Sequence, residues 1–318
     1  MSNFWTRLTK PFTVLAPMDD VTDYAFRELV TNYLPRPDVF FTEFTNAEGL
    51  VSAGRKSVLK KFLYSDSHRP IVAQIWGINP DNLKKAAKIV FDLGFDGVDI
   101  NMGCPDRKVV KKGAGAGCIL DFEKTARIIA AVRSGAKKIP VSVKTRLGFN
   151  KIQTNEWISF LLKQGLDALT IHGRTAIQMS EGSANWDEIG KAVEIKNKVS
   201  PSTIIVGNGD ILSYSQVLTM YDKHHVDGVM IGRGIFHDPW VFEKQIEKIQ
   251  RDKKEYFDLL KKHIDIFDKT WGKTKNFSTL KKFCKMYIKG FDGASSLREK
   301  LMNAKDSKEM LLILQSFT

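Results

Sequence analysis

The sequence has few cysteines, no long apolar run and too few acidic residues to balance its basic ones. None of its apolar stretches approaches the roughly 20 residues that a membrane-spanning helix needs, so we expect no membrane anchor. The three cysteines, Cys104, Cys118 and Cys284, are an odd number without metal-ligand spacing. They indicate reduced thiols and no resident metal. The first residues also lack the apolar core of a signal peptide, so we expect a cytoplasmic protein.

The shortage of acidic residues leaves a net charge of +13, from 49 Lys+Arg against 36 Asp+Glu. A basic protein of this size often binds a polyanion, most often nucleic acid, although a generally basic proteome gives the same figure. The charge is concentrated, because residues 241–318 hold 18 Lys+Arg against 11 Asp+Glu. This segment is therefore the candidate for binding nucleic acid, and an ordinary solvated surface is the alternative.

Short runs rich in Val and Ile recur along the first 240 residues. They lack polar alternation, which is typical of strands buried on both faces. Segments of helical period lie between them, such as Asn79–Leu93, Asp121–Val132 and Trp157–Lys163. Eight strand–helix units predict an α/β fold of the (β/α)₈ TIM-barrel type, with an open doubly wound sheet as the alternative. The expected strands are Phe12–Ala16, Val39–Phe44, Ile71–Trp76, Gly97–Asn101, Val141–Thr145, Ala168–His172, Thr203–Gly207 and Gly228–Gly232.

No strand-like run follows Asp238-Pro239-Trp240. Amphipathic patterns take over, and their apolar faces leave most lysines outside. We therefore expect a barrel domain over residues 1–240 and a small all-helical domain over residues 241–318. The expected helices are Val241–Ile249, Tyr256–Thr270, Ser278–Lys289, Leu297–Asn303 and Lys308–Leu314.

The stretch Asp96–Gly117 combines a buried strand with a thiol on a turn. Gly103 and Pro105 flank Cys104 and prevent regular structure there. Basic residues follow within a few positions, and a thiol beside positive charge can act as a proton donor or nucleophile. From these residues alone, a small buried filler is an equally good interpretation of Cys104.

Polar residues stand at the carboxyl ends of most expected strands, where barrel enzymes place their active groups. Left unpaired in an apolar interior, each would cost about 1–3 kcal/mol, so packing alone explains them poorly. The glycine-rich turns Gly207–Asp210 and Gly232–Gly234 follow the last two strands, a frequent phosphate position in barrels. Gln74 could pair with the imide edge of a flavin ring, and Lys144 could balance negative charge on the reduced ring. Together with the two glycine-rich turns, these residues predict a flavin mononucleotide pocket. No GxGxxG follows the first strand, which disfavours a Rossmann dinucleotide site.

These segments resemble the tRNA-dihydrouridine synthase family. The motifs occur in family order from Ala16 to about Trp240, and the NMGCP turn with the HGRT and NGD segments is highly specific. They are APMDDVTDYAFR at Ala16–Arg27, AQIWGINP at Ala73–Pro80, GFDGVDINMGCPDRKVVKKGAGAG at Gly94–Gly117, VSVKTRLG at Val141–Gly148, LTIHGRT at Leu169–Thr175, GSANW at Gly182–Trp186, VGNGDI at Val206–Ile211 and GVMIGRG at Gly228–Gly234.

The resemblance implies an FMN-containing barrel that reduces uridines of tRNA to 5,6-dihydrouridine, with NADPH as reductant. Flavin N5 would give hydride to C6, and Cys104 would give a proton to C5. Asn101, Arg146 and Arg174 would contact the flipped base or its phosphate. The C-terminal part resembles the family's RNA-binding helices, and we expect a monomer. FMN would be held by Pro17, Met18, Asp19, Gln74, Lys144, His172, Asn208, Gly209, Asp210, Gly232 and Arg233.

Three departures from the family pattern leave the subfamily and the modified uridine open. Asp19-Asp20 stand where small residues are common, which would place carboxylates beside the flavin; Cys118 and Thr145 are the others. Two further functions stay under consideration. One is a flavin barrel acting on a free small molecule, as dihydroorotate dehydrogenases do, which leaves the basic C-terminal segment unexplained. The other is an inactive RNA-binding scaffold.

Overall fold

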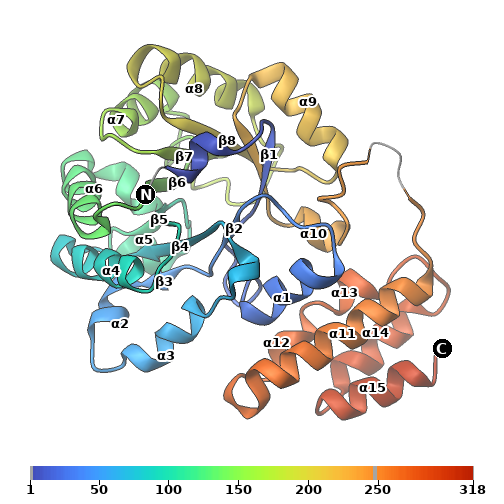
Figure 1. Ribbon diagram of the computed structural model, residues 1–318. Coiled ribbons are helices and arrows are strands. Elements are labelled where there is room, and N and C mark those ends of the chain that lie inside the picture. Colours follow the sequence, from blue (N-terminus) through green and yellow to red (C-terminus); the bar gives the residue numbers. More distant parts are fainter. Residues whose placement is uncertain (1–2, 246–248, 318) are drawn as a thin grey trace.

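The computed structural model describes residues 3–245 and 249–317. Figure 1 shows a ring of parallel strands wrapped by helices, with the C-terminal helices gathered on one side. The apolar runs form the strands because nearly every position in them is covered by neighbouring strands and helices. In the described residues the strands are β1 (Phe12–Leu15), β2 (Phe40–Phe41), β3 (Thr45–Asn46), β4 (Ile71–Trp76), β5 (Gly97–Met102), β6 (Val141–Arg146), β7 (Ala168–His172), β8 (Ile204–Asn208) and β9 (Gly228–Ile231).

All strand pairs are parallel, in the order β1-β9-β8-β7-β6-β5-β4-β2, with β3 also paired to β4. The ring closes between β1 and β2 through one isolated bridge, Val14 to Val39. Backbone hydrogen bonds support it, from Leu15 N to Val39 O and from Val39 N to Thr13 O, both 3.1 Å. The TIM-barrel prediction is confirmed, and the open doubly wound sheet is excluded.

One strand differs from its prediction. Of the run expected as a single strand, Val39–Phe44, only Phe40–Phe41 forms a strand (β2), and β3 begins after the run, at Thr45. The Thr42 side chain explains the break, because its hydroxyl accepts from the backbone N–H of Gln74 at 3.1 Å. The Thr42 hydroxyl therefore accepts the hydrogen bond that a backbone carbonyl would accept in a regular parallel pairing with β4.

The helices of the barrel begin at side-chain caps that the sequence already contains. Asn79 accepts from the Asn82 backbone N–H at 3.1 Å, and Asp121 accepts from Lys124 N at 2.9 Å. The expected helix Trp157–Lys163 starts earlier, in a π-type turn at Thr154–Ile158. The helices are α1 (Tyr24–Tyr33), α2 (Ala47–Val51), α3 (Arg55–Leu59), α4 (Pro80–Asp92), α5 (Arg107–Lys111), α6 (Phe122–Ala136), α7 (Ser159–Leu162), α8 (Trp186–Val199), α9 (Tyr214–His224) and α10 (Gly234–His237).

The described C-terminal residues form helices from Lys253 onward, and two of the five helices expected after residue 240 differ from their prediction. The helix expected over Val241–Ile249 is absent from its described residues 241–245 and 249, and its remaining part lies outside the described residues. The helix expected over Ser278–Lys289 is two short ones. No described helix is long and apolar enough to cross a membrane. The helices are α11 (Lys253–Trp271), α12 (Ser278–Lys281), α13 (Cys284–Tyr287), α14 (Ala294–Asn303) and α15 (Ser307–Gln315).

The C-terminal helices pack against α1 of the barrel. The ring of Phe26 stacks on Phe283 at 5.1 Å between centroids and lies 5.7 Å from His263. Trp271 donates its indole N–H to Asp23 Oδ2 at 2.9 Å. One apolar core runs from the outer faces of the strands into these helices. Their separation as an independent domain over residues 241–318 therefore stays a prediction.

Replacement of Gly228 by Ala should destabilise the barrel. A Cβ built at Gly228 lies 2.3–2.6 Å from ring atoms of Phe12 on the neighbouring strand. Such overpacking costs about 1–3 kcal/mol, which urea unfolding would measure. Gly54→Ala is the matched control, because its nearest atom is 3.5 Å away; an equal loss in both variants would contradict the packing interpretation.

Candidate active site

A cavity of about 460 Å³ opens at the carboxyl ends of the strands. Nine of the eleven residues predicted to hold FMN line it; Asp19 and Gln74 do not. Arg146, predicted to contact substrate, lines it as well. The lining residues are Ala16, Pro17, Met18, Lys144, Arg146, His172, Ser180, Asn208, Gly209, Asp210, Ile211, Leu212, Met230, Gly232, Arg233 and Gly234.

Lys144 is one of the cations that line this cavity. Its Nζ donates to Asn208 Oδ1 at 3.0 Å, and Asn208 Nδ2 in turn donates to Met230 O at 2.8 Å. Burial, followed by the charge of Arg146, lowers the pKa of Lys144 to about 8. The amine is still protonated at pH 7, and an anion in the cavity would hold it so.

His172 faces the same cavity as a neutral imidazole. Burial and then the neighbouring cations, Lys144 first, lower the pKa of His172 to about 2. Arg174 Nη1 lies 3.2 Å from His172 Nε2. Since a guanidinium can only donate, Nε2 accepts, and the proton is assigned to Nδ1 by this contact. The ring therefore has a fixed tautomer, with one donor left for another group.

Arg146 lines the cavity, whereas Arg174 does not. The Nε of Arg146 donates to Gly103 O at 2.8 Å, and its Nη1 donates to Thr175 O at 2.9 Å. Arg174 is 2% exposed and pairs with Asp210 Oδ2 at 2.6 Å. It also donates to Gly182 O. Arg174 thus holds the loops together and has little surface left for a substrate.

The turn after β8 has two consecutive residues with positive φ, Gly209 and Asp210. Gly209 has φ 134°, and a Cβ there would lie 2.5 Å from Ala184 Cβ. Asp210 has φ 56°, and its carboxylate accepts from Ala184 N at 2.8 Å. Arg233 is exposed and lies 3.7 Å from Asp210 Oδ1. Asp210 therefore orients the turn, and the Arg233 guanidinium stays available to a phosphate.

The Cys104 turn is held by its backbone. The carbonyl of Cys104 accepts from Ala116 N at 2.9 Å. Gly115 allows this approach, because a Cβ there would lie 2.7 Å from that oxygen. Burial raises the pKa of the Cys104 thiol, while Arg146 opposes the rise. The half-buried thiol is therefore protonated at pH 7, within electrostatic reach of a cavity-lining cation.

Asp99 lies beneath this turn, and sequence reasoning missed it. It is fully buried and shares a register layer with Gln74 on β4 and Ser142 on β6. Its Oδ1 accepts from Ser142 Oγ at 2.6 Å, and its Oδ2 accepts from Gln74 Nε2 at 2.8 Å. Burial raises the pKa of Asp99 to about 6, so the group is a carboxylate at pH 7. Its position two residues before Asn101, on the same strand face, was the available signal.

The carboxylate fixes the direction of every hydrogen bond above it. Because Asp99 only accepts, Gln74 turns its NH₂ toward Asp99 and its oxygen toward Asn101, which donates at 3.0 Å. The Asn101 oxygen then accepts from the backbone N–H of Gly103 at 3.2 Å and of Cys104 at 3.0 Å. Gln74 and Asn101 thus position the thiol turn. We call this chain the Asp99 relay: Ser142, Asp99, Gln74, Asn101 and the Cys104 turn.

Asp19 does not line the cavity and forms an ion pair with Lys61. In the described part of the chain no group of three or more His, Cys, Asp or Glu side chains could hold a metal ion. The cations of the cavity suit an anionic ligand. Cys104 does not line the cavity but lies on the adjoining turn, where the Gly103 carbonyl accepts from Arg146 at 2.8 Å.

Replacement of Asp99 by Leu should loosen the Cys104 turn. The buried Gln74 amide would lose its acceptor, at a cost of about 1–3 kcal/mol, and the thiol should react faster with iodoacetamide. Cys118 and Cys284 are buried and have pKa values of about 11, so the rate reports Cys104. Ser142→Ala keeps the Asp99–Gln74 bond and should alkylate as the wild type does; equal rates in all three proteins would refute the relay.

The family described as dihydrouridine synthase (Dus) matches residues 14–318. The chain is 42% identical to the probable tRNA-dihydrouridine synthase of Staphylococcus epidermidis, over 99% of this chain and 96% of that protein. It is also 42% identical to probable tRNA-dihydrouridine synthase 2 of Bacillus subtilis, with the same coverage. A solved structure of a morphinone reductase mutant in complex with tetrahydroNAD matches with a TM-score of 0.51, covering 73% of this chain and 85% of that one. At 11% identity this shows a shared fold only. The family match and the two relatives establish that the chain belongs to the dihydrouridine synthase family.

Proposed function

We propose that this protein holds FMN at the barrel mouth and, with NADPH as reductant, reduces specific uridines of tRNA to 5,6-dihydrouridine. The observation that carries the proposal is a cationic cavity at the strand ends, with a protonated thiol on the adjoining turn. Membership of the family and similarity to tRNA-dihydrouridine synthases support the substrate. The tRNA substrate also leads us to infer a cytoplasmic enzyme.

The donor set of the cavity fits FMN. Lys144 and Arg146 place positive charge toward the barrel axis, and Arg233 with the Gly232 turn supplies a phosphate position at the rim. Pro17 and Met18 offer the apolar wall that a flat ring needs. The remaining lining residues of the predicted set are Asn208, Gly209, His172 and Asp210. Asp210 would orient the turn after β8. Gln74, which does not line the cavity, would act through its hydrogen bond with Asn101.

FMN bound there would supply the hydride for C6 of the uracil. The Cys104 thiol would give its proton to C5 from the other side of the base. Its raised pKa suits a donor, because the group keeps its proton until the reaction needs it. The Asp99 relay keeps the turn in place, and Arg146 lies close enough to guide the base or its phosphate. Arg174 would act through His172 and Asp210.

A groove of about 710 Å³ between the barrel and the C-terminal helices is the proposed RNA site. Among its described lining residues Asp238 is the one acidic side chain, and the aromatic residues Phe236, Tyr256 and Phe291 line it together with the cations. Arg233 and Gly234, which line the cavity, directly precede this groove in the chain, so an RNA backbone in the groove passes close to the cavity. Its cations are Arg251, Lys253, Lys282, Lys285, Lys289 and Arg298.

A uridine inside folded tRNA must leave its stack to enter the cavity. Unstacking costs a few kcal/mol, and phosphate contacts in the groove can offset that cost. The small-molecule alternative leaves the basic groove without a use. NADPH oxidation that needs tRNA would exclude that alternative, and flavin absorbance of the purified protein would exclude the scaffold.

Replacement of Cys104 by Ala should stop product formation but keep flavin binding. Loss of a general acid typically costs about 10²–10⁴ in rate, measured as dihydrouridine formed in a tRNA transcript. Flavin absorbance and flavin reduction by NADPH should persist. Cys284→Ala, a buried thiol far along the chain, is the matched control and should stay active; an undiminished rate in Cys104→Ala would refute the acid role.

Binding of tRNA to the wild-type protein should weaken steeply with salt. Contacts to about six phosphates predict a loss of roughly 10³ in affinity between 50 and 200 mM salt. Fluorescence anisotropy of a labelled transcript measures it. A flat response would remove RNA from the proposed function.

A further inference from the structure

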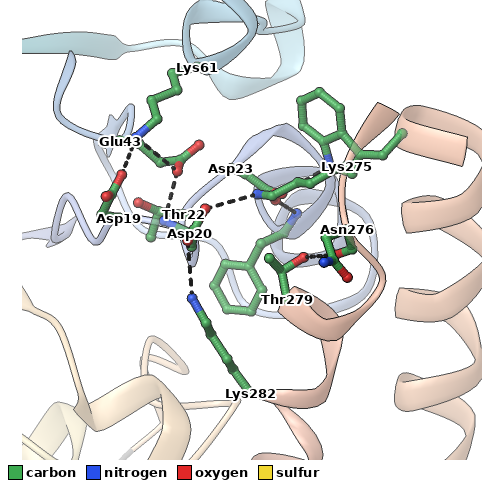
Figure 2. Close-up of polar contacts among 12 residues, drawn as sticks. Asp19, Asp20, Thr22, Asp23, Glu43, Lys61, Lys275, Asn276, Thr279 and Lys282 are labelled. Carbon is green, nitrogen blue, oxygen red and sulfur yellow. Dashed lines mark hydrogen bonds and ion pairs between the residues drawn. The ribbon is translucent and has the colours of Figure 1, made fainter. Parts of the chain in front are cut away.

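Asp20 brings a carboxylate of the barrel to two lysines of the C-terminal helices. Figure 2 shows it between Lys275 and Lys282, with Lys282 Nζ 3.2 Å from Oδ2 and Lys275 Nζ 3.8 Å from Oδ1. Burial acts to raise the pKa of Asp20, but Lys282, Lys275 and Lys61 together hold it below its usual value. The group is therefore charged across the physiological range.

The backbone fixes where this carboxylate points. Asp20 has φ 55°, in the left-handed region that side chains other than Asn and Asp rarely adopt. Its N–H donates to the buried Glu43 carboxylate at 2.7 Å. Glycine would adopt this conformation more easily. The chain instead carries a charged side chain here, two residues after the cavity-lining Met18.

Lys282 belongs to the RNA groove, and Asp20 is its partner. The Lys282 side chain is 47% exposed and lines the groove beside Lys285. Lys275 differs, because Asp23 already holds it at 2.7 Å. Asp20 thus mainly neutralises Lys282, a cation that could otherwise contact RNA.

We propose that Asp20 competes with an RNA phosphate for Lys282 and so lowers the groove's affinity for RNA. The inference rests on the proposed function. Phosphate binding gains free energy when a lysine releases its counterions to the solvent. A lysine that already has a carboxylate partner must give up that partner first. Asp20 therefore imposes the same cost on every RNA that enters the groove.

A simple clamp between barrel and helices is the competing interpretation of Asp20. An exposed ion pair contributes little to stability, and other contacts already hold the two parts together. Asp23 binds Trp271 at 2.9 Å and Lys275 at 2.7 Å, and Phe26 packs on Phe283. Figure 2 shows the contact of Asp23 with Lys275 beside those of Asp20. The clamp predicts weaker RNA binding when Asp20 is neutralised, and the competitor predicts stronger binding.

The test is Asp20→Asn in the full chain, since Asn keeps the shape and the left-handed backbone. An unmodified tRNA transcript is titrated at several salt concentrations between 50 and 200 mM. We expect binding about tenfold tighter at 50 mM and about threefold tighter at 200 mM, with the salt slope steeper by roughly 0.7–0.9, the value of one added phosphate contact. Asp92→Asn, which frees Lys88 from an exposed pair on α4, is the matched control and should bind as the wild type does.

A double variant then assigns the effect to Lys282. In a Lys282→Gln background, Asp20→Asn should no longer tighten binding. Unchanged or weaker binding by the single variant, or a gain that persists without Lys282, would overturn the inference. If the wild type itself binds the transcript without salt dependence, the proposed function fails instead. Thermal unfolding of each variant shows whether the fold is kept.

Discussion

The interior of this barrel can hold polar groups only if each finds its partner there, and the Asp99 relay meets that demand. A carboxylate accepts and never donates, so Asp99 decides how the Gln74 and Asn101 amides are turned. Their orientation ends at the backbone N–H groups of the Cys104 turn. The buried Asp99 carboxylate, on the strand between β4 and β6, thus fixes the backbone of the turn that carries Cys104. Removal of one partner would leave the others unpaired in a low-dielectric interior.

Much of the fold could be predicted from the sequence. The apolar runs locate the strands because burial on both faces leaves no polar alternation, and caps such as Asn79 and Asp121 locate helix starts. The break between β2 and β3 could not be predicted, since it depends on the Thr42 hydroxyl accepting a hydrogen bond from the backbone N–H of Gln74 on β4. The break between α12 and α13 lets Phe283 stack on Phe26. Such contacts join distant residues, and no local pattern encodes them.

The sequence predicted where most residues of the candidate site would lie, but not which groups their side chains would contact. Strand ends gather at the barrel mouth, so residues such as Lys144 and Asn208 could be named in advance. What each side chain touches depends on distant partners. Arg174 donates hydrogen bonds to Asp210 and to the Gly182 carbonyl, and Asp19 forms an ion pair with Lys61. Asp99 was overlooked because an acidic residue inside an apolar run looks like an exception until its neighbours in register are known.

The strands are joined unequally around the ring. Adjacent strands such as β5 and β6 share five register pairs, whereas β1 meets the second strand segment at the single Val14–Val39 bridge. Regions with few backbone hydrogen bonds open at the lowest free energy. The seam beside the segment that carries Pro17 and Met18 is therefore held by fewer register pairs than the wall between β5 and β6. The C-terminal helices pack on α1, directly after that segment, and so support it from outside while they contribute the lysines of the proposed RNA groove.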